Sequence, residues 1–331
     1  MNVLLTGGAG FIGSHLVRAL VTAGHTPVVV DNLSNGHRAA VGDAAFIEAD
    51  VADGEAIARV LREHAIDAVI HLAACIEAGE SVVHPDKYFR NNTVIGMALL
   101  DAMRSAGVAK MVFSSTAAVY GTPERVPIAE SDRLEPINPY GMSKLCVEYM
   151  LRAYATAYGM GFVSLRYFNV GGADPAGGIG EDHAPETHLI PLTLQVALGR
   201  RADIKIFGDD YDTPDGTCVR DYIHVCDLCD AHVLALGAIE PGRVRAYNLG
   251  NGEGFSVRQV IETCREVTAH EIPAELAPRR PGDPAKLVAA SGLARDQLAW
   301  RPNYGDLATI VAHAWAWHES HPAGYGDRPG S

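Results

Sequence analysis

The chain has 331 residues, of which 48% are hydrophobic and 20% charged, a balance typical of a globular protein with one large or two modest domains. Its formal net charge of -13 disfavours non-specific binding to nucleic acids or anionic membranes. The sequence contains neither a run of about 18 apolar residues, as a membrane span needs, nor the basic start of a signal peptide. We therefore expect a cytoplasmic protein whose scattered cysteines are reduced thiols.

The first elements predict a nucleotide-binding unit. Val3-Leu4-Leu5 is typical of a buried parallel strand, and a helical pattern covers residues 14–23. The glycines between them fit two versions of one motif, either Gly8, Gly10 and Gly13 or Gly7, Gly10 and Gly13. Such glycines permit a tight turn and let the backbone approach a pyrophosphate, which then faces the helix N-terminus. The motif alone is weak, but its place between a strand and a helix predicts a dinucleotide site.

The next strand, over residues 27–30, ends in an acid that bears on the choice of cofactor. Asp31 follows Gly13 by 18 residues, where a carboxylate can bind both ribose hydroxyls of NAD and repel the extra phosphate of NADP. The alternative is an aspartate in an ordinary turn. Arg38 lies a few residues further on and would soften the exclusion of NADP.

Strands and helices continue to alternate as far as Thr116. Short strands are indicated at residues 46–47, 68–70 and 111–113, with helices at 55–64 and 91–106. This alternation predicts an α/β fold of Rossmann type, a doubly wound parallel sheet with right-handed crossovers. Ligands bind beyond the carboxyl ends of the strands in such sheets. The residues that follow strands should therefore meet at one edge, and they are Gly7, Asp31, Asp50, Ala73 and Thr116.

The helix after the fifth strand carries the candidate base. Pro139 suits a first helical turn, and Tyr140 and Lys144 then lie on one face. A tyrosine with a pKa of ~10 needs about 4 kcal/mol of differential stabilisation to lose roughly 3 pKa units. One lysine hardly supplies that, so we expect a second positive charge nearby, such as an oxidised nicotinamide. Y-x-x-x-K is common by chance, but the convergence of the strand ends favours a functional pair.

The second half holds candidate anion-binding residues. Residues 171–180 form a glycine-rich segment that favours a ligand-lining loop over a plain surface connection. Arg220 and Arg280 are the candidates for bidentate contact with a diphosphate, whereas Arg279 fits a solvated surface pair. The acidic segment 209–216 fails the register of a calcium loop, the C-x-x-C at residues 226–229 lies in a helical pattern, and the histidines are dispersed. No metal site is predicted.

Motifs across nearly the whole chain match one known pattern. The matching stretches are Thr6 to His15, Asp31 to Gly36, Gly79 to Val82, Phe113 to Gly121, Tyr140 to Lys144, Leu165 to Asn169, Gly216 to Val225 and Ala277 to Asp283. On these stretches the sequence resembles the extended short-chain dehydrogenase/reductases and, within them, the UDP-glucose 4-epimerases. The last two stretches are much more specific to the epimerases than the glycine motif is.

The resemblance implies roles for named residues. The catalytic residues would be Thr116, Tyr140 and Lys144. Besides the motif glycines, NAD would contact Phe11, Ile12, Asp31, Asn32, Leu33, Ser34, Asn35, Gly36, Asp50, Val51, Leu72, Ala73, Ala74, Ile76, Asn91, Tyr140, Lys144 and Phe168. The nucleotide sugar would contact Thr116, Tyr140, Asn169, His188, Arg220, Arg280, Asp283 and Leu287.

Three positions depart from the family pattern or tune it. Many members carry a lysine at the position of Ile76, and some carry an asparagine at the position of His188, so one cofactor contact and one sugar contact are in question. The residue near Leu287 walls the sugar pocket, and a bulky tyrosine there restricts N-acetyl sugars in some members. Leu287 is intermediate in size, which leaves the use of N-acetylhexosamines open.

The resemblance implies interconversion of UDP-galactose and UDP-glucose by transient oxidation at sugar carbon 4, with NAD tightly bound and not consumed. An epimerase for UDP-N-acetylhexosamines or UDP-uronates is the first alternative. A nucleotide-sugar dehydratase or decarboxylase is the second, although Ala117 and Ala118 stand where those enzymes place an acid. A non-enzymatic NAD-binding module would need Thr116, Tyr140 and Lys144 to coincide by chance.

The expected organisation has two domains. An NAD-binding domain covers residues 1–168 and is completed by elements from about 219–250. A smaller C-terminal substrate domain covers 169–218 and 251–320, and residues 321–331 form a tail. The helices at 91–106 and 140–158 would form a four-helix homodimer interface through apolar positions expected to be exposed, namely Met97, Leu100, Met150 and Tyr154.

Overall fold

A computed structural model of the chain describes residues 1–280 and 283–327. Pro281 and Gly282 of the Ala277 to Asp283 stretch lie outside the described residues, as do the last four residues of the expected tail. The larger part of the molecule is a seven-stranded parallel sheet with the order β11-β6-β5-β4-β1-β2-β3. Its strands are β1 (Asn2–Thr6), β2 (Thr26–Asp31), β3 (Ala45–Glu48), β4 (Ala68–His71), β5 (Lys110–Ser114), β6 (Gly161–Tyr167) and β11 (Val244–Leu249).

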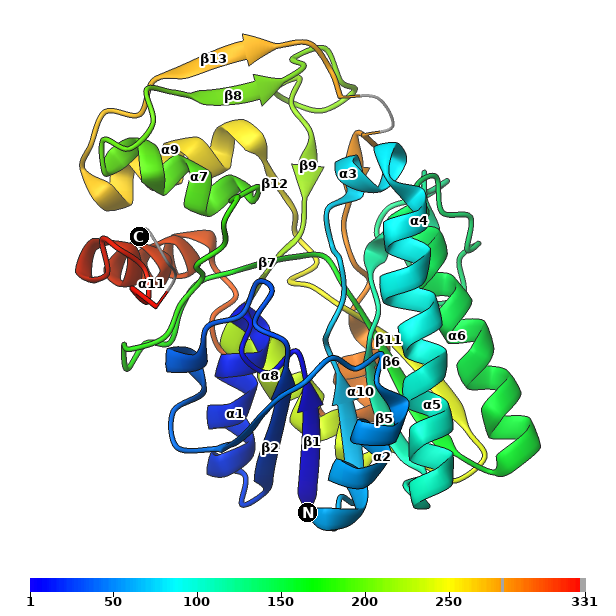
Figure 1. Cartoon of the computed structure of the whole chain (residues 1–331). Helices are drawn as coiled ribbons and strands as arrows, with labels where there is room; N and C mark the ends of the chain where they lie inside the picture. The colour runs from blue at the N-terminus through cyan, green and yellow to red at the C-terminus, as the bar shows by residue number, and fades with distance from the viewer. Residues whose placement is uncertain (281–282, 328–331) are drawn as a thin grey trace.

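Helices cover both faces of this sheet (Figure 1). On one face lie α1 (Phe11–Thr22), α8 (Val225–Gly237) and α10 (Gly292–Gln297), and on the other lie α2 (Gly54–Glu63), α5 (Ile95–Ala106) and α6 (Pro139–Tyr158). Alternating residues of β1 divide between the two cores, since Val3 and Leu5 pack with the first group and Leu4 with the second. The predicted doubly wound α/β sheet is confirmed.

A smaller unit sits beyond the carboxyl ends of the strands (Figure 1). Its core is formed by α7 (Leu189–Ala197), α9 (Val257–Thr268) and α11 (Leu307–Ser320), against the parallel pair β8 (Ile204–Phe207) and β13 (Ala274–Ala277). Short ladders connect the two units: β7 (Asn169–Gly171) with β10 (Tyr222–His224), and β9 (Val219–Arg220) with β12 (Phe255–Ser256) and β14 (Lys286–Leu287). The chain therefore crosses between the units several times.

The remaining short elements cluster near the same edge of the sheet. They are η1 (Arg38–Val41), α3 (Ala78–Val83), α4 (Pro85–Tyr88), η2 (Phe89–Val94) and η3 (Ala117–Tyr120). The expected helix at 91–106 is therefore α5 preceded by η2, a π-helical segment. Such wide turns are frequent at functional sites.

Two regions differ from expectation. Leu100 is fully buried in the core between the sheet and α2, so it is not one of the exposed apolar positions, whereas Met97 is 45% exposed. The described part of the expected tail is packed, because the Tyr325 amide donates to Asp182 and Asp327 pairs with His37. Composition suggested a tail, but these contacts, together with the hydrogen bond from the Gly180 amide to the Tyr325 hydroxyl, hold the segment against the end of the glycine-rich loop and His37.

Candidate active site

The glycine loop between β1 and α1 has the shape that a pyrophosphate needs. A Cβ atom on Gly7, whose φ is +74°, would lie 2.7 Å from the Ala73 nitrogen, and one on Gly13 would lie 2.3 Å from the Gly7 oxygen. Both positions therefore need glycine for close backbone packing. Within the described chain, no side chain caps the first turn of α1, and that turn holds no acid. Its amides and the helix dipole remain available to an anion, so the loop fits the dinucleotide predicted for it.

Asp31 is placed for a ribose and also braces the loop. One carboxylate oxygen accepts from the Ala9 amide at 3.0 Å, and the other accepts from the Leu33 amide at 2.9 Å. Burial raises the pKa of this carboxyl, and the two backbone bonds oppose the rise. Each oxygen keeps a second lone pair that can accept a ribose hydroxyl. Gly36 lies directly against Ala9, which brings the Asp31–Gly36 segment onto the glycine loop.

Asp50 and its neighbours form the adenine side of the predicted cofactor site. The Asn32 amide donates to Asp50 at 3.2 Å, so the ends of β2 and β3 are linked. Val51 is buried in the core, which leaves only its main chain to a ligand, whereas Ile76 is 41% exposed. An apolar Ile76 side chain in the open site cannot supply the charged contact of a lysine.

Asn92, the neighbour of the predicted cofactor contact Asn91, anchors the loop after β4. Its side chain exchanges two hydrogen bonds with the backbone of Cys75, at 2.9 and 3.0 Å, and donates to the Ser143 hydroxyl at 3.0 Å. It is buried and ties the loop after β4 to the helix that carries the candidate base. Asn91 only donates to the Asn92 side chain. The adjacent pair of asparagines was the sole signal, and it did not say which side chain points inward.

Tyr140 and Thr116 meet at the start of α6. Asn138 caps this helix by accepting from the Gly141 amide at 2.9 Å, and Pro139 occupies its first turn. The Thr116 oxygen accepts from the Ala118 amide at 3.1 Å, so its hydroxyl hydrogen is free to be donated elsewhere. The Thr116 hydroxyl acts on the Tyr140 phenol and opposes the rise of its pKa. A Cβ atom on Gly141 would lie 2.5 Å from the Ala118 oxygen, so glycine permits this close approach.

The electrostatics of the pair differ from the simple expectation. Burial raises the pKa of Tyr140, while the Thr116 hydrogen bond opposes the rise and the charge of Glu77 adds to it. Lys144 is itself buried, which lowers its pKa to about 7. Its Nζ atom donates to the Ser114 carbonyl at 2.9 Å. The chain by itself therefore holds a neutral tyrosine, and a positive charge from a bound ligand is needed to favour the phenolate.

A buried polar network supports α6 from behind. Glu148, one turn after Lys144, accepts from Arg166 at 2.9 and 2.5 Å and from the Ser115 hydroxyl at 2.6 Å. Arg166 also donates to Tyr120, which donates to Asn248 of β11. These groups are almost fully buried, so each depends on its partners. The network holds the side chain of Ser115, the residue before Thr116, and it holds α6, the helix that carries Tyr140.

The sugar-diphosphate residues form a second cluster. Asp283 accepts from Arg220 at 3.1 Å and pairs with Arg280 at 2.9 Å, so one carboxylate holds two guanidinium groups and leaves a net positive charge. Arg280 is exposed, and Arg279 instead pairs with Asp210 at the surface. Leu287 and Phe168 pack in one small apolar cluster with Leu145 of α6. Leu287, a predicted sugar-pocket residue, is thereby brought near α6, the helix that carries the candidate base.

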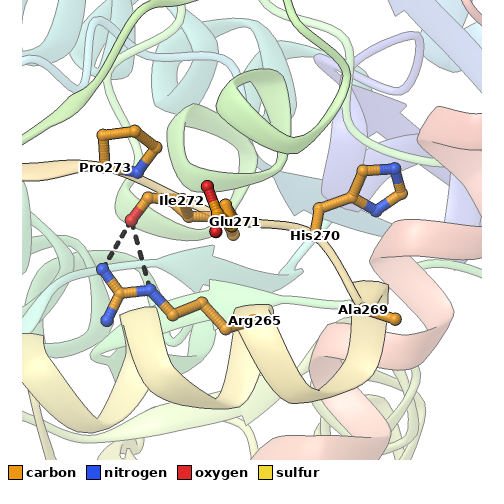
Figure 2. Close-up of a pocket in the computed structure, with 6 residues that line it drawn as sticks. All are labelled: Arg265, Ala269, His270, Glu271, Ile272 and Pro273. Carbon is orange, nitrogen blue, oxygen red and sulfur yellow. Dashed lines mark hydrogen bonds between the residues drawn. The ribbon is translucent and has the colours of Figure 1, made fainter.

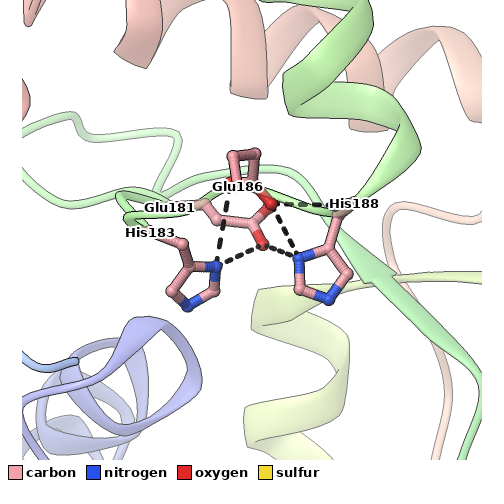
Figure 3. Close-up of side chains that lie close together, drawn as sticks. All are labelled: Glu181, His183, Glu186 and His188. Atoms are coloured by element: carbon pink, nitrogen blue, oxygen red, sulfur yellow. Dashed lines mark hydrogen bonds and ion pairs between the residues drawn. The ribbon is translucent and has the colours of Figure 1, made fainter. Parts of the chain in front are cut away.

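His188 belongs to a cluster of four polar side chains. Together with Glu181, His183 and Glu186 it forms a tight group between β7 and α7 (Figure 3). From the sequence, His188 was predicted as a sugar contact alone, and no metal site was predicted. The sequence signal for the cluster is the spacing E-x-H-x-x-E-x-H in residues 181–188.

A cavity of about 440 Å³ lies elsewhere, at the C-terminal end of α9 (Figure 2). Arg265 projects toward it, but its guanidinium donates to the Ile272 carbonyl at 3.1 Å. The cavity belongs to the smaller unit and is remote in the fold from the strand ends. It contributes no residue to the site described above.

Comparison with known proteins agrees with this geometry. Residues 3–250 match the model of the NAD dependent epimerase/dehydratase family. The chain belongs to this family. Within the described residues, no helix is both long and apolar enough to cross a membrane.

Members of the epimerase/dehydratase family resemble the chain over nearly its full length. It is 55% identical over 327 residues to a UDP-glucose 4-epimerase of Streptomyces lividans, covering 98% of each chain. The UDP-glucose 4-epimerase of Brucella ovis, solved in complex with NAD, superposes with a TM-score of 0.92 at 48% identity, covering 95% of this chain and 97% of that one. The enzyme of Bifidobacterium longum, solved with NAD+ and UDP, gives a TM-score of 0.94 at 39% identity, covering 98% and 100%.

Proposed function

We propose that the chain interconverts UDP-galactose and UDP-glucose by inverting the configuration at sugar carbon 4. The observation that supports this proposal is the pairing of Thr116 with Tyr140 near the end of β5, where the buried Lys144 donates to the Ser114 carbonyl. Relatives about 50% identical over the whole chain are UDP-glucose 4-epimerases. The reaction is an isomerisation in which substrate and product have the same oxidation state.

The residues of the site divide the work. Held by the glycine loop and Asp31, NAD would supply reversible hydride transfer at sugar carbon 4. Tyr140 takes the proton of the 4-hydroxyl, directly or through Thr116, and gives it back in the second half of the cycle. Lys144 holds the ribose side of the cofactor, and Arg220 and Arg280 hold the diphosphate while the keto sugar turns about its phosphate linkage.

The cofactor contacts follow the glycine loop and the strand ends. Gly7, Gly10 and Gly13 admit the pyrophosphate, Asp31 accepts the adenosine ribose hydroxyls, and Asp50 with Asn32 closes the adenine end. Because the net redox change is zero, NAD stays bound between turnovers. Asn92 rather than Asn91 shapes the nicotinamide side, since it holds the loop after β4.

The decisive assay adds UDP-galactose to purified protein without added NAD and follows UDP-glucose by chromatography. We expect conversion from the cofactor that copurifies. The Tyr140→Phe variant should lose about 10²–10⁴-fold in kcat with a small change in KM, the usual worth of a general acid–base group. Tyr149→Phe removes a hydroxyl on the same helix and keeps the ring that the proposed dimer would cover, so it is the matched control and should retain full activity. Absence of conversion even with NAD supplied would sink the proposal.

Breadth of sugar use follows from Leu287. Its intermediate size leaves room beside Phe168, so UDP-N-acetylgalactosamine is the first additional substrate to test. A Leu287→Tyr variant should retain UDP-galactose turnover and lose any N-acetyl turnover, because the larger ring fills the pocket. Products of altered mass would instead indicate a dehydratase or decarboxylase, which the absence of an acid at Ala117 and Ala118 disfavours.

The assembly that we propose is a cytoplasmic homodimer formed through α5 and α6. These helices pack side by side on one face of the sheet. They expose Met97, Tyr149 and Tyr158, large side chains that monomeric proteins usually bury in part. A four-helix interface would cover them.

A further inference from the structure

The geometry points to a zinc site formed by Glu181, His183, Glu186 and His188, in the segment between β7 and α7. All four residues direct their polar ends toward one point in Figure 3. Each offers one ligand atom, and these four atoms lie within 4.8 Å of one another. The site shares only His188 with the predicted sugar contacts, and metal binding can be tested without reference to the proposed epimerase activity.

The distances between the ligand atoms suit a tetrahedral ion. Ligands that lie about 2.0–2.2 Å from a tetrahedral zinc are separated from one another by roughly 3.3–3.6 Å. Glu181 Oε1 lies 3.2 Å from Nδ1 of His183 and 2.9 Å from Nδ1 of His188. Glu186 Oε2 lies 3.7 Å from Nδ1 of His183, whereas its other oxygen, Oε1, lies 3.0 Å from Nδ1 of His188, so either oxygen of Glu186 can serve as its ligand atom. Small outward shifts of the shorter pairs would place an ion between them.

Simple ion pairs explain this arrangement less well. Each imidazole points one nitrogen, Nδ1, at both carboxylates. A single N–H proton can lie along only one of two such directions, so one contact of each histidine lacks a well-aligned hydrogen. A central cation satisfies all four contacts. Two glutamates, two neutral histidines and Zn²⁺ sum to zero charge, as two carboxylates and two imidazolium ions also would, so the buried carboxylates are compensated in either case and the geometry carries the inference.

The surroundings fix the ligands, as outer partners do in metal sites. Glu186 Oε1 accepts from the amides of Thr187 at 2.7 Å and His188 at 2.8 Å. The Glu181 carbonyl accepts from Trp317 of α11 at 3.3 Å. Four protein ligands leave no open position, which is the pattern of a structural rather than a catalytic zinc.

Zinc binding would also affect the sugar side of the active site. His188 directly precedes α7, and its side chain is 33% exposed. A metal on Nδ1 leaves the proton on Nε2, which makes that nitrogen a fixed hydrogen-bond donor. The ion would therefore pin the segment 181–188 and set the tautomer of a predicted substrate contact.

The test uses the full, untagged protein. After treatment with a chelator, it is titrated with Co²⁺ alone and followed by visible absorption, then back-titrated with Zn²⁺. We expect one Co²⁺ per chain with the intense bands of a tetrahedral ion, displaced by one equivalent of Zn²⁺. Metal analysis of untreated protein should find about one zinc per chain. Weak octahedral Co²⁺ bands, or no saturable binding, would overturn the proposed zinc site, whatever the binding results for the variants.

Variants identify the ligands. Glu181→Gln and His183→Asn should each weaken Co²⁺ binding by at least about 100-fold, because loss of an outer partner alone costs about 10–100-fold. His270→Asn, a change of an exposed histidine outside the cluster, should bind as the parent does. Near-ultraviolet circular dichroism checks that each variant is folded. Unchanged tetrahedral binding in folded Glu181→Gln and His183→Asn would contradict the assignment.

Discussion

At the scale of the residue, the candidate base is held neutral by its own protein environment. Burial raises the pKa of Tyr140, and the buried Lys144 carries its charge only at a cost. The Thr116 hydroxyl stabilises the phenolate but does not outweigh burial. The positive charge that tips the balance must then arrive with a ligand, and an oxidised nicotinamide supplies it.

This leads to a redox-dependent tyrosine. The pKa of Tyr140 should be lower with NAD⁺ bound than with NADH, because reduction removes the nearby positive charge. The measurement is the tyrosinate absorbance of the parent minus that of Tyr140→Phe, titrated in both redox states. Equal titration curves in the two states would contradict the account.

Lys144 makes stability depend on pH in a definite direction. Its pKa is about 7 in the folded chain, against an unfolded value of about 10.4. Between these values the unfolded chain binds more protons, so the free energy of unfolding should rise with pH, by at most about 1.4 kcal/mol per unit. Urea unfolding of nucleotide-free protein at pH 7 and pH 9 measures this, relative to Lys144→Met. A parent and a variant that change in parallel would show that burial of the charge has no such cost.

At the scale of the element, the residues that begin α6 determine the position of the candidate base. Asn138 and Pro139 begin the helix, and Gly141 lets it touch the backbone at Ala118. Tyr140 lies on α6, and Thr116 directly precedes η3. The close approach of these two elements needs a residue without a Cβ atom at position 141.

Gly141→Ala should therefore reduce kcat without unfolding the protein. The new methyl would lie 2.5 Å from the Ala118 oxygen, so α6 must move away from η3. A displacement near 1 Å can cost on the order of 10²-fold in rate. Gly237→Ala in α8 is the matched control, since its Cβ would meet nothing within 4 Å. Initial rates with UDP-galactose compare the two variants. A fully active Gly141→Ala would show that α6 can move away from η3 without loss of rate.

At the scale of the whole molecule, two units are joined by several chain crossings, and the predicted site lies where they meet (Figure 1). The smaller unit supplies Arg280, whereas the sheet and its flanking segments supply Tyr140 and Thr116. The connecting ladder of β9 and β14 brings Arg220 beside Leu287. Under the proposed function, both units are needed to place a sugar diphosphate against Tyr140.

The proposed dimer gives a prediction at the same scale. Met97→Glu should shift the protein toward monomer, because a charge would be buried at the interface of α5 and α6. Val21→Glu, on the exposed face of α1, should leave the assembly unchanged. Size-exclusion chromatography with light scattering at micromolar concentration measures the mass. A parent chain that is already monomeric there would rule out the dimer.

Local patterns in the sequence were enough to predict the doubly wound sheet, the glycine loop, Asp31 and the Tyr140–Lys144 helix. These features depend on short-range periodicity and on glycines that no other residue can replace. Each can therefore be recognised from a few neighbouring residues of the sequence. The membership in the epimerase/dehydratase family was visible from motifs in both halves. What Tyr140 and Lys144 do to each other was not visible, because a pKa depends on burial and on neighbours distant in sequence.

Only the tertiary structure decided which of two adjacent asparagines points inward, how Glu148 and Arg166 brace the helix, and which acids meet His188. It also showed that Leu100 is core and that the residues up to Asp327 are packed. Each of these outcomes depends on contacts across many residues of chain, where spacing carries little information. Sequence determined the fold and the chemical groups of this protein, and packing determined their protonation, their partners and the four-residue cluster before α7.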